Sequence, residues 1–362
     1  MPSSTFSFDS AARRLPRLRW LLVLGFGAAL ALLFAATLEY TLRARGFRPT
    51  VSDSQALWAK QRARAAALGE HALILVGDSQ VQTDFDLAVL HRATGLDPVE
   101  LGIDGNSFVP VLTGLARDTA IRGTVLVGFA DAELARPNPD ATAAHYEADY
   151  ERAGTTTTFN YRRVEAALED HWHAALASYA DGARPWSTLL LRALDTDARP
   201  QYVTIGLDRT RVIDYSQANL RSLRLRSAAF QLDGAAVASG NLVQREQDLA
   251  ARIAALQPAD EQAYAERAAA IETAVLAIRA RGGRVVFVRL PIAGDAADIE
   301  RRRYPRATFW DRFAASSSAR CLRSEDDARL RAFVPPDDLH LDGSARPAFS
   351  AAVVAALDLA PR

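Results

Sequence analysis

One stretch near the N-terminus limits what this chain can fold into more than any other feature. Residues 20–38 read WLLVLGFGAALALLFAATL and carry no charged side chain. As an α-helix this stretch would be about 28 Å long at ~1.5 Å per residue, close to the ~30 Å hydrocarbon core of a bilayer. A helix that is apolar on every face has no polar side to show to water. We therefore expect a transmembrane anchor over residues 20–38.

The flanks of this run favour an uncleaved anchor over a cleaved signal peptide. Several arginines precede it, and Trp20 and Tyr40 stand at its two ends, where interfacial aromatic residues are typical. A signal peptide has a shorter apolar core of ~7–15 residues and a small-residue cleavage site, for which residues 34–36 (Phe-Ala-Ala) are a poor match. We expect residues 1–19 to form a cytoplasmic tail, with a single-pass anchor in the inner membrane and the rest of the chain periplasmic or extracellular.

Beyond the anchor, short apolar runs that end at glycine or proline alternate with helical patterns. The expected strands cover residues 72–76, 98–101, 124–129 and 284–290. The expected helices cover residues 85–94, 107–121 and 261–281, followed by a last helix from 343 to 357. Strands joined by helices of this length pair in parallel. The predicted fold class is therefore α/β, with three α/β/α layers around a parallel sheet.

The strand–helix rhythm also suggests how the chain is divided. Residues 39–70 are expected to be a polar, mostly helical connection, and residues 71–358 the α/β domain. Residues 132–260 interrupt the rhythm, with an expected helix over 162–180 and a possible hairpin within 202–215. Such a long insertion between strands is usually a lid or a recognition subdomain.

Composition excludes some classes of function. Lysine and arginine number 43 and aspartate and glutamate also 43, so the net charge gives no argument for nucleic-acid binding. Cys321 is the only cysteine, which rules out an internal disulfide and suggests a small buried apolar residue. His171 and His173 are two apart on an expected helix, so they point to different faces and are poor metal ligands. We expect neither a metal nor a cofactor.

Two motifs carry chemistry. Gly77-Asp78-Ser79 follows the first strand directly, which places a serine where a buried strand gives way to a helix. Asp337 and His340 lie three residues apart in a turn before the last helix. A serine hydroxyl becomes a good nucleophile when a histidine accepts its proton and a carboxylate orients that histidine. The strand ends of a parallel sheet share one edge, where sites of such folds lie. These residues therefore predict a Ser-His-Asp hydrolytic site.

Four short blocks in this order resemble the SGNH or GDSL hydrolases, and together they span roughly half of the chain. The blocks are LILVGDSQ (73–80), VELGIDGNS (99–107), VLVGFAD (125–131) and PDDLHLDGSARPAF (336–349). The resemblance implies a flavodoxin-like sheet, Ser79 as nucleophile, and Asp337 and His340 as the other members of the triad. It further implies an oxyanion hole that uses the backbone N–H groups of Ser79 and Gly105.

The third block departs from the family pattern. The family usually reads Gly-x-Asn-Asp there, and the asparagine side chain donates to the oxyanion, whereas this chain has Ala130 at that position. Losing one such donor typically costs ~10²–10³ in rate. Membrane-tethered members that transfer acyl groups onto cell-surface polymers also depart from the consensus.

Several residues keep more than one interpretation. Asp338 is the rival of Asp337 as triad acid, and the resemblance favours Asp337, because its three-residue offset from His340 matches the family block. Asp78 is expected to shape its turn, and Asp84 to cap the helix over 85–94. Asp84 and Asp86 are both plausible caps or substrate contacts. A surface role is preferred over an anionic-glycan site for a group of arginines: Arg136, Arg289 and Arg301–Arg303.

Three functions remain open from the sequence. The first is a membrane-anchored serine acyl-ester hydrolase or O-acyltransferase that adds acetyl to, or removes it from, a cell-envelope or extracellular polysaccharide. By resemblance to anchored O-acetyltransferases, a multispanning membrane acyltransferase would be its partner. The second is an esterase or lipase that acts on small or lipid esters. The third, which Ala130 motivates, is a non-catalytic glycan-binding scaffold on a decayed hydrolase fold.

Overall fold

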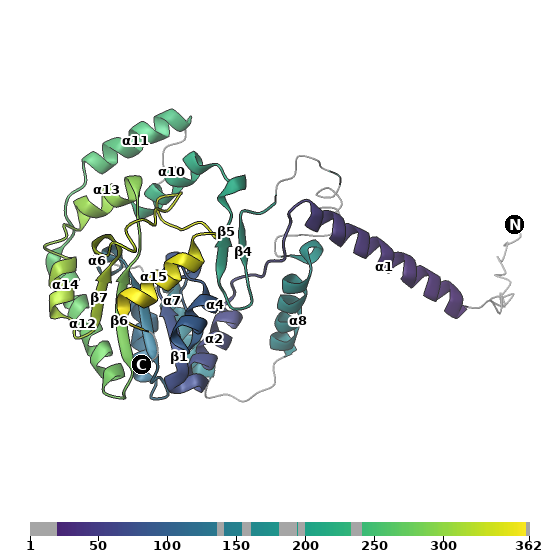
Figure 1. Cartoon of the computed structure of the whole chain (residues 1–362), viewed down its shortest axis with the longest axis horizontal. Helices are drawn as coiled ribbons and strands as arrows, with labels where there is room; N and C mark the ends of the chain where they lie inside the picture. The colour runs from purple at the N-terminus through teal and green to yellow at the C-terminus, as the bar shows by residue number, and fades with distance from the viewer. Residues whose placement is uncertain are drawn as a thin grey trace, which may run out of the picture.

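A parallel sheet of five strands forms the centre of the computed structural model, which describes residues 20–135, 141–153, 161–180, 194, 200–232 and 241–359 (Figure 1). The strand order is β2-β1-β3-β6-β7, and all four neighbouring pairs are parallel. The chain steps from β1 outward to β2 and then returns to the other side of β1 with β3. Ligands of open α/β sheets bind at such a reversal. The strands are β1 (Ala72–Val76), β2 (Asp97–Glu100), β3 (Thr124–Phe129), β6 (Arg284–Arg289) and β7 (Arg320–Arg323).

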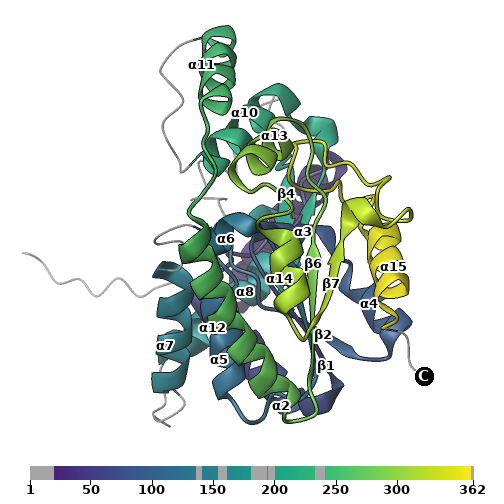
Figure 2. The ribbon, with the colours of Figure 1, turned by 90° about the vertical axis from the view of Figure 1, so that its left-hand side faces the viewer.

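Helices cover both faces of the sheet, which confirms the predicted three-layer α/β/α architecture. Figure 2 shows α4 and α15 on one side and α5 and α12 on the other. Side chains alternate along β1, so Ile74 joins the core beneath α5 and α12 while Leu73 joins the core beneath α4 and α15. The helices of these layers are α2 (Gln55–Leu68), α3 (Ser79–Asp84), α4 (Leu87–Thr94), α5 (Val109–Arg117), α12 (Glu261–Arg279), α13 (Gly294–Arg303), α14 (Trp310–Ser316) and α15 (Arg346–Leu357).

The strongest apolar runs were predicted to the residue, and weaker ones were not. β1 and β3 begin and end where expected, because all of β1 and all of β3 after the half-buried Thr124 are buried, and a glycine follows β1. β7 was missed, since its sequence Arg-Cys-Leu-Arg has no apolar run and its residues are at most half-buried. The helix expected over 85–94 is α4, which starts at Leu87 because Asp86 caps it by accepting the N–H of Val89. The expectation that Asp84 would be this cap is wrong.

The stretch between the apolar helix and the sheet is not a free connection. Its helix α2 packs against β1 and β2. Trp58 of α2 is fully buried, and its indole N–H donates to the carbonyl of Leu101 (3.1 Å). Arg62, also buried, pairs with Asp118 (2.9 Å) and Glu147 (3.3 Å). These contacts make α2 part of the α/β domain.

The insertion between β3 and β6 contributes several helices and a hairpin. The two-stranded antiparallel sheet of β4 (Val203–Ile205) and β5 (Arg211–Ile213) confirms the hairpin considered for residues 202–215. Its helix near the expected 162–180 is α8 (Tyr161–Ala175). The other described helices are α6 (Asp131–Ala135), α7 (Ala141–Ala153), α10 (Leu220–Gln231) and α11 (Leu242–Ala254).

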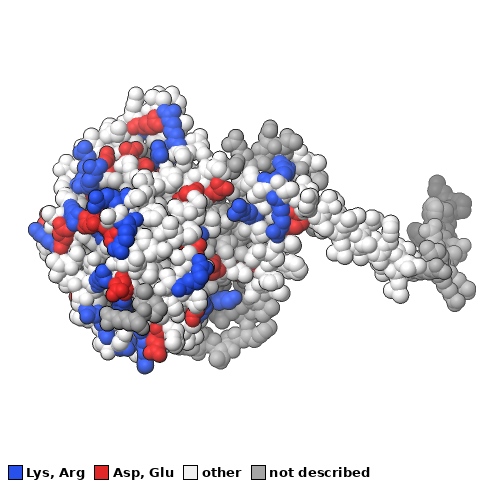
Figure 3. Space-filling model, in the orientation of Figure 1, with Lys and Arg blue, Asp and Glu red and all other residues white. Residues whose placement is uncertain are grey.

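Near the N-terminus, α1 (Trp20–Ala44) projects away from the domain (Figure 1). Most of its large apolar side chains are exposed, and no charged side chain is visible on its projecting part (Figure 3). Of the helices in the described ranges, this one is long and apolar enough to cross a membrane, a property that a signal sequence near an N-terminus shares. The tail expected over residues 1–19 lies outside the described residues.

Candidate active site

Ser79 lies at the carboxyl end of β1, where the strand turns into the short helix α3. Asp78 is the N-cap of α3, and its Oδ1 accepts the N–H of Gln80 (2.8 Å). This cap fixes the turn and makes Ser79 the first helical residue, with its side chain half-buried at the carboxyl edge of the sheet. Asp78 therefore shapes the turn, as expected, and does so as the cap of α3. Burial raises the pKa of Asp78 above its usual range, against the N–H of Gln80 and the charge of His340.

The structure brings Ser79, His340 and Asp337 into one hydrogen-bonded row. Ser79 Oγ lies 2.9 Å from His340 Nε2, and His340 Nδ1 lies 2.9 Å from Asp337 Oδ2. Both distances are ordinary for hydrogen bonds. In the neutral histidine, an Nδ1–H that donates to Asp337 leaves Nε2 as an acceptor for the serine proton. The row therefore has the geometry of a serine nucleophile with a general base and a carboxylate that orients it.

Asp337, and not Asp338, faces the histidine. The other oxygen of Asp337, Oδ1, accepts the backbone N–H groups of Leu339 (3.0 Å) and His340 (2.7 Å). Burial opposes its charge, but the hydrogen bond and charge of His340 and these two N–H groups outweigh burial and lower the pKa of Asp337. Asp338 has a positive φ of 73°, and its carboxylate lies 3.6 Å from the guanidinium of Arg224.

The environment of His340 favours its charged form. Burial of the ring lowers its pKa, but the hydrogen bond to Asp337 and the negative charges of Asp337, Asp84 and Asp78 outweigh burial and raise the pKa above its ordinary value. An imidazolium that forms as Ser79 loses its proton would be stabilised by the same groups. The site is thus prepared for proton transfer to this ring.

Hydrogen bonds hold α3 against the loop that carries the acid and the base. The side-chain amide of Gln80 donates to the carbonyl oxygens of Leu339 (2.6 Å) and Pro291 (3.2 Å). From the other end of α3, Asp84 Oδ1 accepts the N–H of Leu341 (2.9 Å). Burial raises the pKa of Asp84 to about 7, although the hydrogen bond from Leu341 N–H and the charge of His340 both favour the ionised carboxylate. Asp84 therefore fastens the histidine loop.

The oxyanion hole that the family resemblance implies would use the backbone N–H groups of Ser79 and Gly105. Neither Ser79 N–H nor Gly105 N–H has a hydrogen-bond acceptor among the described residues, so both are free to donate. Gly105 has a φ of 66°, a backbone conformation that favours glycine. Ala130 is half-buried, and its methyl group offers no donor. A buried carboxyl, Glu100, shapes the loop before Gly105 by accepting the N–H of Gly102 (2.7 Å).

A cavity of about 360 Å³ opens over Ser79, and the insertion forms its roof. α10 starts near the loop that carries Asp337 and His340, where Arg224 donates to the carbonyl of Pro336 (2.9 Å). It ends near Gly105, against which Phe230 lies. The hairpin closes another side through a hydrogen bond from Gly343 N–H to the carbonyl of Ile213 (2.8 Å). The lining residues that the insertion supplies are Tyr202, Val203, Arg211, Ile213, Arg226, Ser227, Phe230 and Gln231.

Sequence reasoning missed these roof residues, because no short motif marks them. Arg211 donates to Asp104 (2.7 Å) and Asp53 (3.3 Å), which ties the hairpin to the loop that precedes Gly105. Tyr215 is buried, and its hydroxyl donates to the carbonyl of His340 (3.2 Å). The alternation of polar and apolar residues in the predicted hairpin was the one available signal.

Other sequence candidates lie away from this cavity. Arg289 is buried between Asp131 (3.6 Å) and Glu300 (3.1 Å), so the surface role preferred for it is wrong. Arg301 is exposed and pairs with Asp298, and Arg136 lies outside the described residues. Burial raises the pKa of the Cys321 thiol to about 12. Within the described ranges, no group of three or more metal-ligating side chains occurs.

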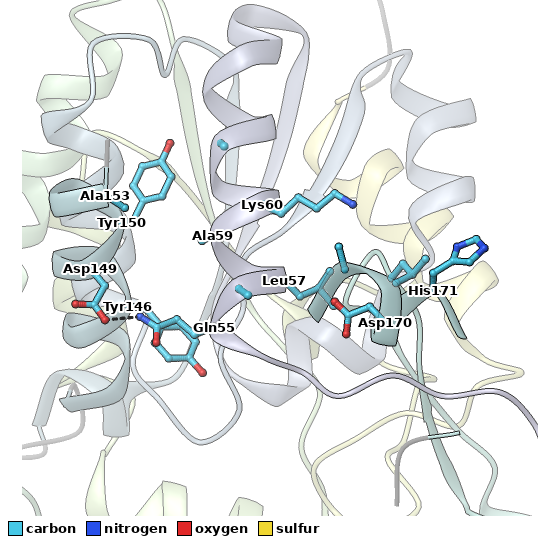
Figure 4. Close-up of a pocket in the computed structure, with 14 residues that line it drawn as sticks. Gln55, Leu57, Ala59, Lys60, Tyr146, Asp149, Tyr150, Ala153, Asp170 and His171 are labelled. Carbon is cyan, nitrogen blue, oxygen red and sulfur yellow. Dashed lines mark hydrogen bonds between the residues drawn. The ribbon is translucent and has the colours of Figure 1, made fainter. Parts of the chain in front are cut away.

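A larger cleft, of about 740 Å³, lies between α2, α7 and α8 (Figure 4). Lys60, the only lysine of the chain, projects from α2 toward Asp170 and His171 of α8. On the opposite wall, Gln55 donates to Asp149 (2.7 Å). The cleft contains none of the residues around Ser79.

Comparison with known proteins adds no further assignment: no protein-family model matches this chain, and neither does any curated protein.

Proposed function

We propose that this chain is a membrane-anchored serine acyl-ester hydrolase or O-acyltransferase of SGNH type. The observation that carries the proposal is the Ser79–His340–Asp337 row, with two hydrogen bonds of 2.9 Å at the mouth of a cavity. Its place at the β1/β3 reversal of a 2-1-3-6-7 sheet supports the family resemblance. α1 supplies the anchor, which puts the domain on the periplasmic or extracellular side.

In the proposed reaction, Ser79 Oγ attacks the carbonyl carbon of an ester while its proton moves to His340 Nε2. The carbonyl oxygen becomes an oxyanion that accepts hydrogen bonds from the N–H groups of Ser79 and Gly105. The ester C–O bond then breaks, the leaving alcohol takes the proton from His340, and the acyl group stays on Ser79. A water or a sugar hydroxyl next gives its proton to His340 and attacks the acyl carbon. The bond between this carbon and Ser79 Oγ then breaks, and Ser79 takes the proton back from His340.

The shape of the cavity favours a small acyl group on a sugar over a long fatty acyl chain. A fatty acyl chain needs an extended apolar tunnel, whereas this cavity of about 360 Å³ is lined by charged and aromatic side chains together. Asp104, Arg211 and Arg226 offer hydrogen bonds to hydroxyl groups, and the ring of Phe230 offers a flat apolar surface. Acetyl on a polysaccharide fits this lining, and a multispanning acyltransferase is the proposed partner for transfer.

The test compares Ser79→Ala with Ser222→Ala, an exposed serine of α10 that does not line the cavity. Wild type and Ser222→Ala should release acetate from p-nitrophenyl acetate and acetylated sugars and should react with a fluorophosphonate probe. Ser79→Ala should lose the probe signal and fall by on the order of 10⁶-fold in kcat, as loss of a triad serine does elsewhere. Product analysis with a sugar acceptor present separates transfer from hydrolysis.

Ala130 favours one other function, a glycan-binding scaffold without catalysis. A chain of this kind would leave the fluorophosphonate unreacted, and the Ser79→Ala substitution would not change its affinity for acetylated oligosaccharides. Acetate release at the uncatalysed background rate by both wild type and Ser79→Ala would decide for this alternative.

A further inference from the structure

One face of α8 has no partner within the described part of the domain. Leu168 and Trp172 lie four residues apart, on one side of the helix, and their exposed fractions are 58% and 53%. The other side of α8 faces the domain, where Ala167, Asp170 and His171 line the large cleft beside α2 and α7 (Figure 4). The exposed apolar pair is thus turned away from the cleft.

The C-terminal end of α8 is tied to α1 by charged and apolar contacts. Both carboxylate oxygens of Glu39 accept backbone N–H groups just after α8, from Ala177 and Ser178 (2.9 Å each). Arg43 donates to the carbonyl of Ala175, the last residue of α8 (2.8 Å). The bond from Arg43 satisfies a carbonyl that the end of α8 leaves open, and the bonds to Glu39 satisfy the first N–H groups of the 3-10 helix that follows (Ala177–Tyr179). They fix the end of α8 to the turn of α1 that follows the apolar run.

Apolar packing also joins α1 to the segment after α8, at the end of the apolar run of α1. Leu38, the last residue of the apolar run, and Leu42 are buried with Phe47 and Ala177 in one small cluster. Figure 1 shows α8 beside the domain at the end of α1, with the rest of α1 projecting beyond it. Tyr40 and Tyr179 are also exposed there, at 75% and 47%. Exposed aromatic residues gather where α1 would leave a bilayer.

We infer that α8 lies on the membrane surface, with Leu168 and Trp172 in the interfacial layer of the same bilayer that α1 crosses. The occupant of this face is lipid, because the end of α8 is fixed to α1 at the point where the apolar run of α1 ends. An exposed leucine and tryptophan on one side of a helix are typical of interfacial segments, where the tryptophan ring sits at the headgroup level. The inference rests on the anchor in the proposed function and is independent of catalysis.

The test uses nitroxide labels on the full-length chain in vesicles of phosphatidylethanolamine and phosphatidylglycerol. Single cysteines are introduced in a Cys321→Ala background at Leu168 and Trp172. Labels at Asp170, on the cleft side of α8, and at Val243, an exposed residue of α11, serve as matched controls. Oxygen concentrates in the bilayer and a nickel chelate in water, so the ratio of the two accessibilities reports the surroundings. The ratio should be severalfold higher at Leu168 and Trp172 than at Asp170 and Val243.

A label at Leu30 of α1 separates the two possible failures. If Leu30 is as accessible to nickel as Val243, the anchor itself is wrong. If Leu30 lies in lipid while Leu168 and Trp172 match Val243, the anchor stands and the surface position of α8 is overturned.

The chain without labels gives a second measurement. Brominated lipids should quench a smaller share of the fluorescence in Trp172→Phe than in wild type, because one quenched indole is lost. An unchanged quenched component would also contradict the inference.

Discussion

At the residue scale, the carboxylate of Asp337 sets the protonation of the proposed base. Its Oδ2 faces His340 Nδ1, and its Oδ1 is held by two backbone N–H groups. The adjacent Asp338 has the same side chain but pairs with Arg224. Two neighbouring carboxylates in different surroundings provide a matched pair of variants.

We predict that Asp337→Asn loses on the order of 10⁴-fold in kcat, the loss that the same change causes in serine proteases. The amide can donate to Nδ1, which would leave Nε2 protonated and unable to accept the proton of Ser79. Because Asp337 raises the pKa of His340, and only neutral His340 can act as base, the residual activity should also extend to lower pH than in wild type. The measurement is kcat/KM for p-nitrophenyl acetate across pH.

Asp338→Asn is the control for this prediction. Asparagine tolerates the positive φ at this position, so the loop should keep its shape. The kcat/KM of Asp338→Asn, and the pH at which it falls on the acid side, should stay close to those of wild type. Equal losses in the two variants would show that the loop, and not the carboxylate beside His340, matters.

The residue scale also shows what sequence reasoning could reach. The three-residue offset selected Asp337 over Asp338, and the structure places Asp337 against the histidine. The role of Asp84 could not be predicted, because its partner Leu341 lies 257 positions away along the chain. A buried carboxylate that fastens a distant loop looks, in sequence, like any helix cap.

At the element scale, two glycines allow α3 to lie close against the sheet. A Cβ built on Gly77 or on Gly128 would overlap Cγ2 of Val81, which is fully buried. Gly77 ends β1 and Gly128 lies in β3, so Val81 packs into a groove between adjacent strands. The glycine of the third block therefore has a packing function that concerns the position of Ser79.

We predict that Gly128→Ala destabilises the chain by ~1–3 kcal/mol, as overpacking does in other cores, and lowers esterase activity because α3 must shift. Val81→Ala removes the overlapping methyl group. The double variant Gly128→Ala/Val81→Ala should therefore be more stable than the sum of the two single effects implies, by ~0.5–3 kcal/mol. Thermal unfolding of the detergent-solubilised chain, followed by circular dichroism, gives the four stabilities. Strict additivity would contradict the proposed contact.

Elements were predictable where local sequence decides them and unpredictable where tertiary contacts do. β1 and β3 are short apolar runs between two cores, so their limits follow from composition alone. α3 is a six-residue helix of polar and buried residues, and its stability depends on the histidine loop. The path of α10 across Ser79 depends on contacts with Pro336 and Gly105, which no periodicity encodes.

At the scale of the whole molecule, several carboxyl groups are buried in the fold with raised pKa values. Burial raises the pKa of Glu100 to about 8, against the N–H of Gly102 and the charge of Arg209. Burial also raises the pKa of Asp84 and of Glu147, each to about 7. One oxygen of Glu100 is buried without a hydrogen-bond partner, as a protonated carboxyl would tolerate better than a charged one.

These groups make stability depend on pH with a definite sign. A carboxyl whose pKa is higher in the fold than in the unfolded chain binds its proton more tightly when folded. Its contribution is complete below the unfolded pKa of ~4.3 and is lost as the pH rises through the folded value. The melting temperature should therefore fall between pH 5 and pH 8–9.

We predict that Glu100→Gln makes this fall shallower, since glutamine stays neutral and keeps an oxygen for the N–H of Gly102. Wild type and variant should differ least near pH 5, and the variant should be the more stable at pH 9. Glu266→Gln, an exposed position of α12, should reproduce the wild-type slope. An unchanged slope in Glu100→Gln would show that Glu100 is already charged in the fold.

The anchor and the domain are joined almost without slack. Between α1 and α2, Phe47 is buried, the N–H of Val51 donates to the carbonyl of Ile205 (3.0 Å), and Asp53 pairs with Arg209 (2.7 Å). With α1 as the proposed anchor, a domain on a flexible linker would explore a volume above the membrane, whereas a domain fixed in this way would stay in a thin layer at a constant distance from the lipid. In the proposed function, Ser79 would then meet a polymer only where the polymer passes through that layer.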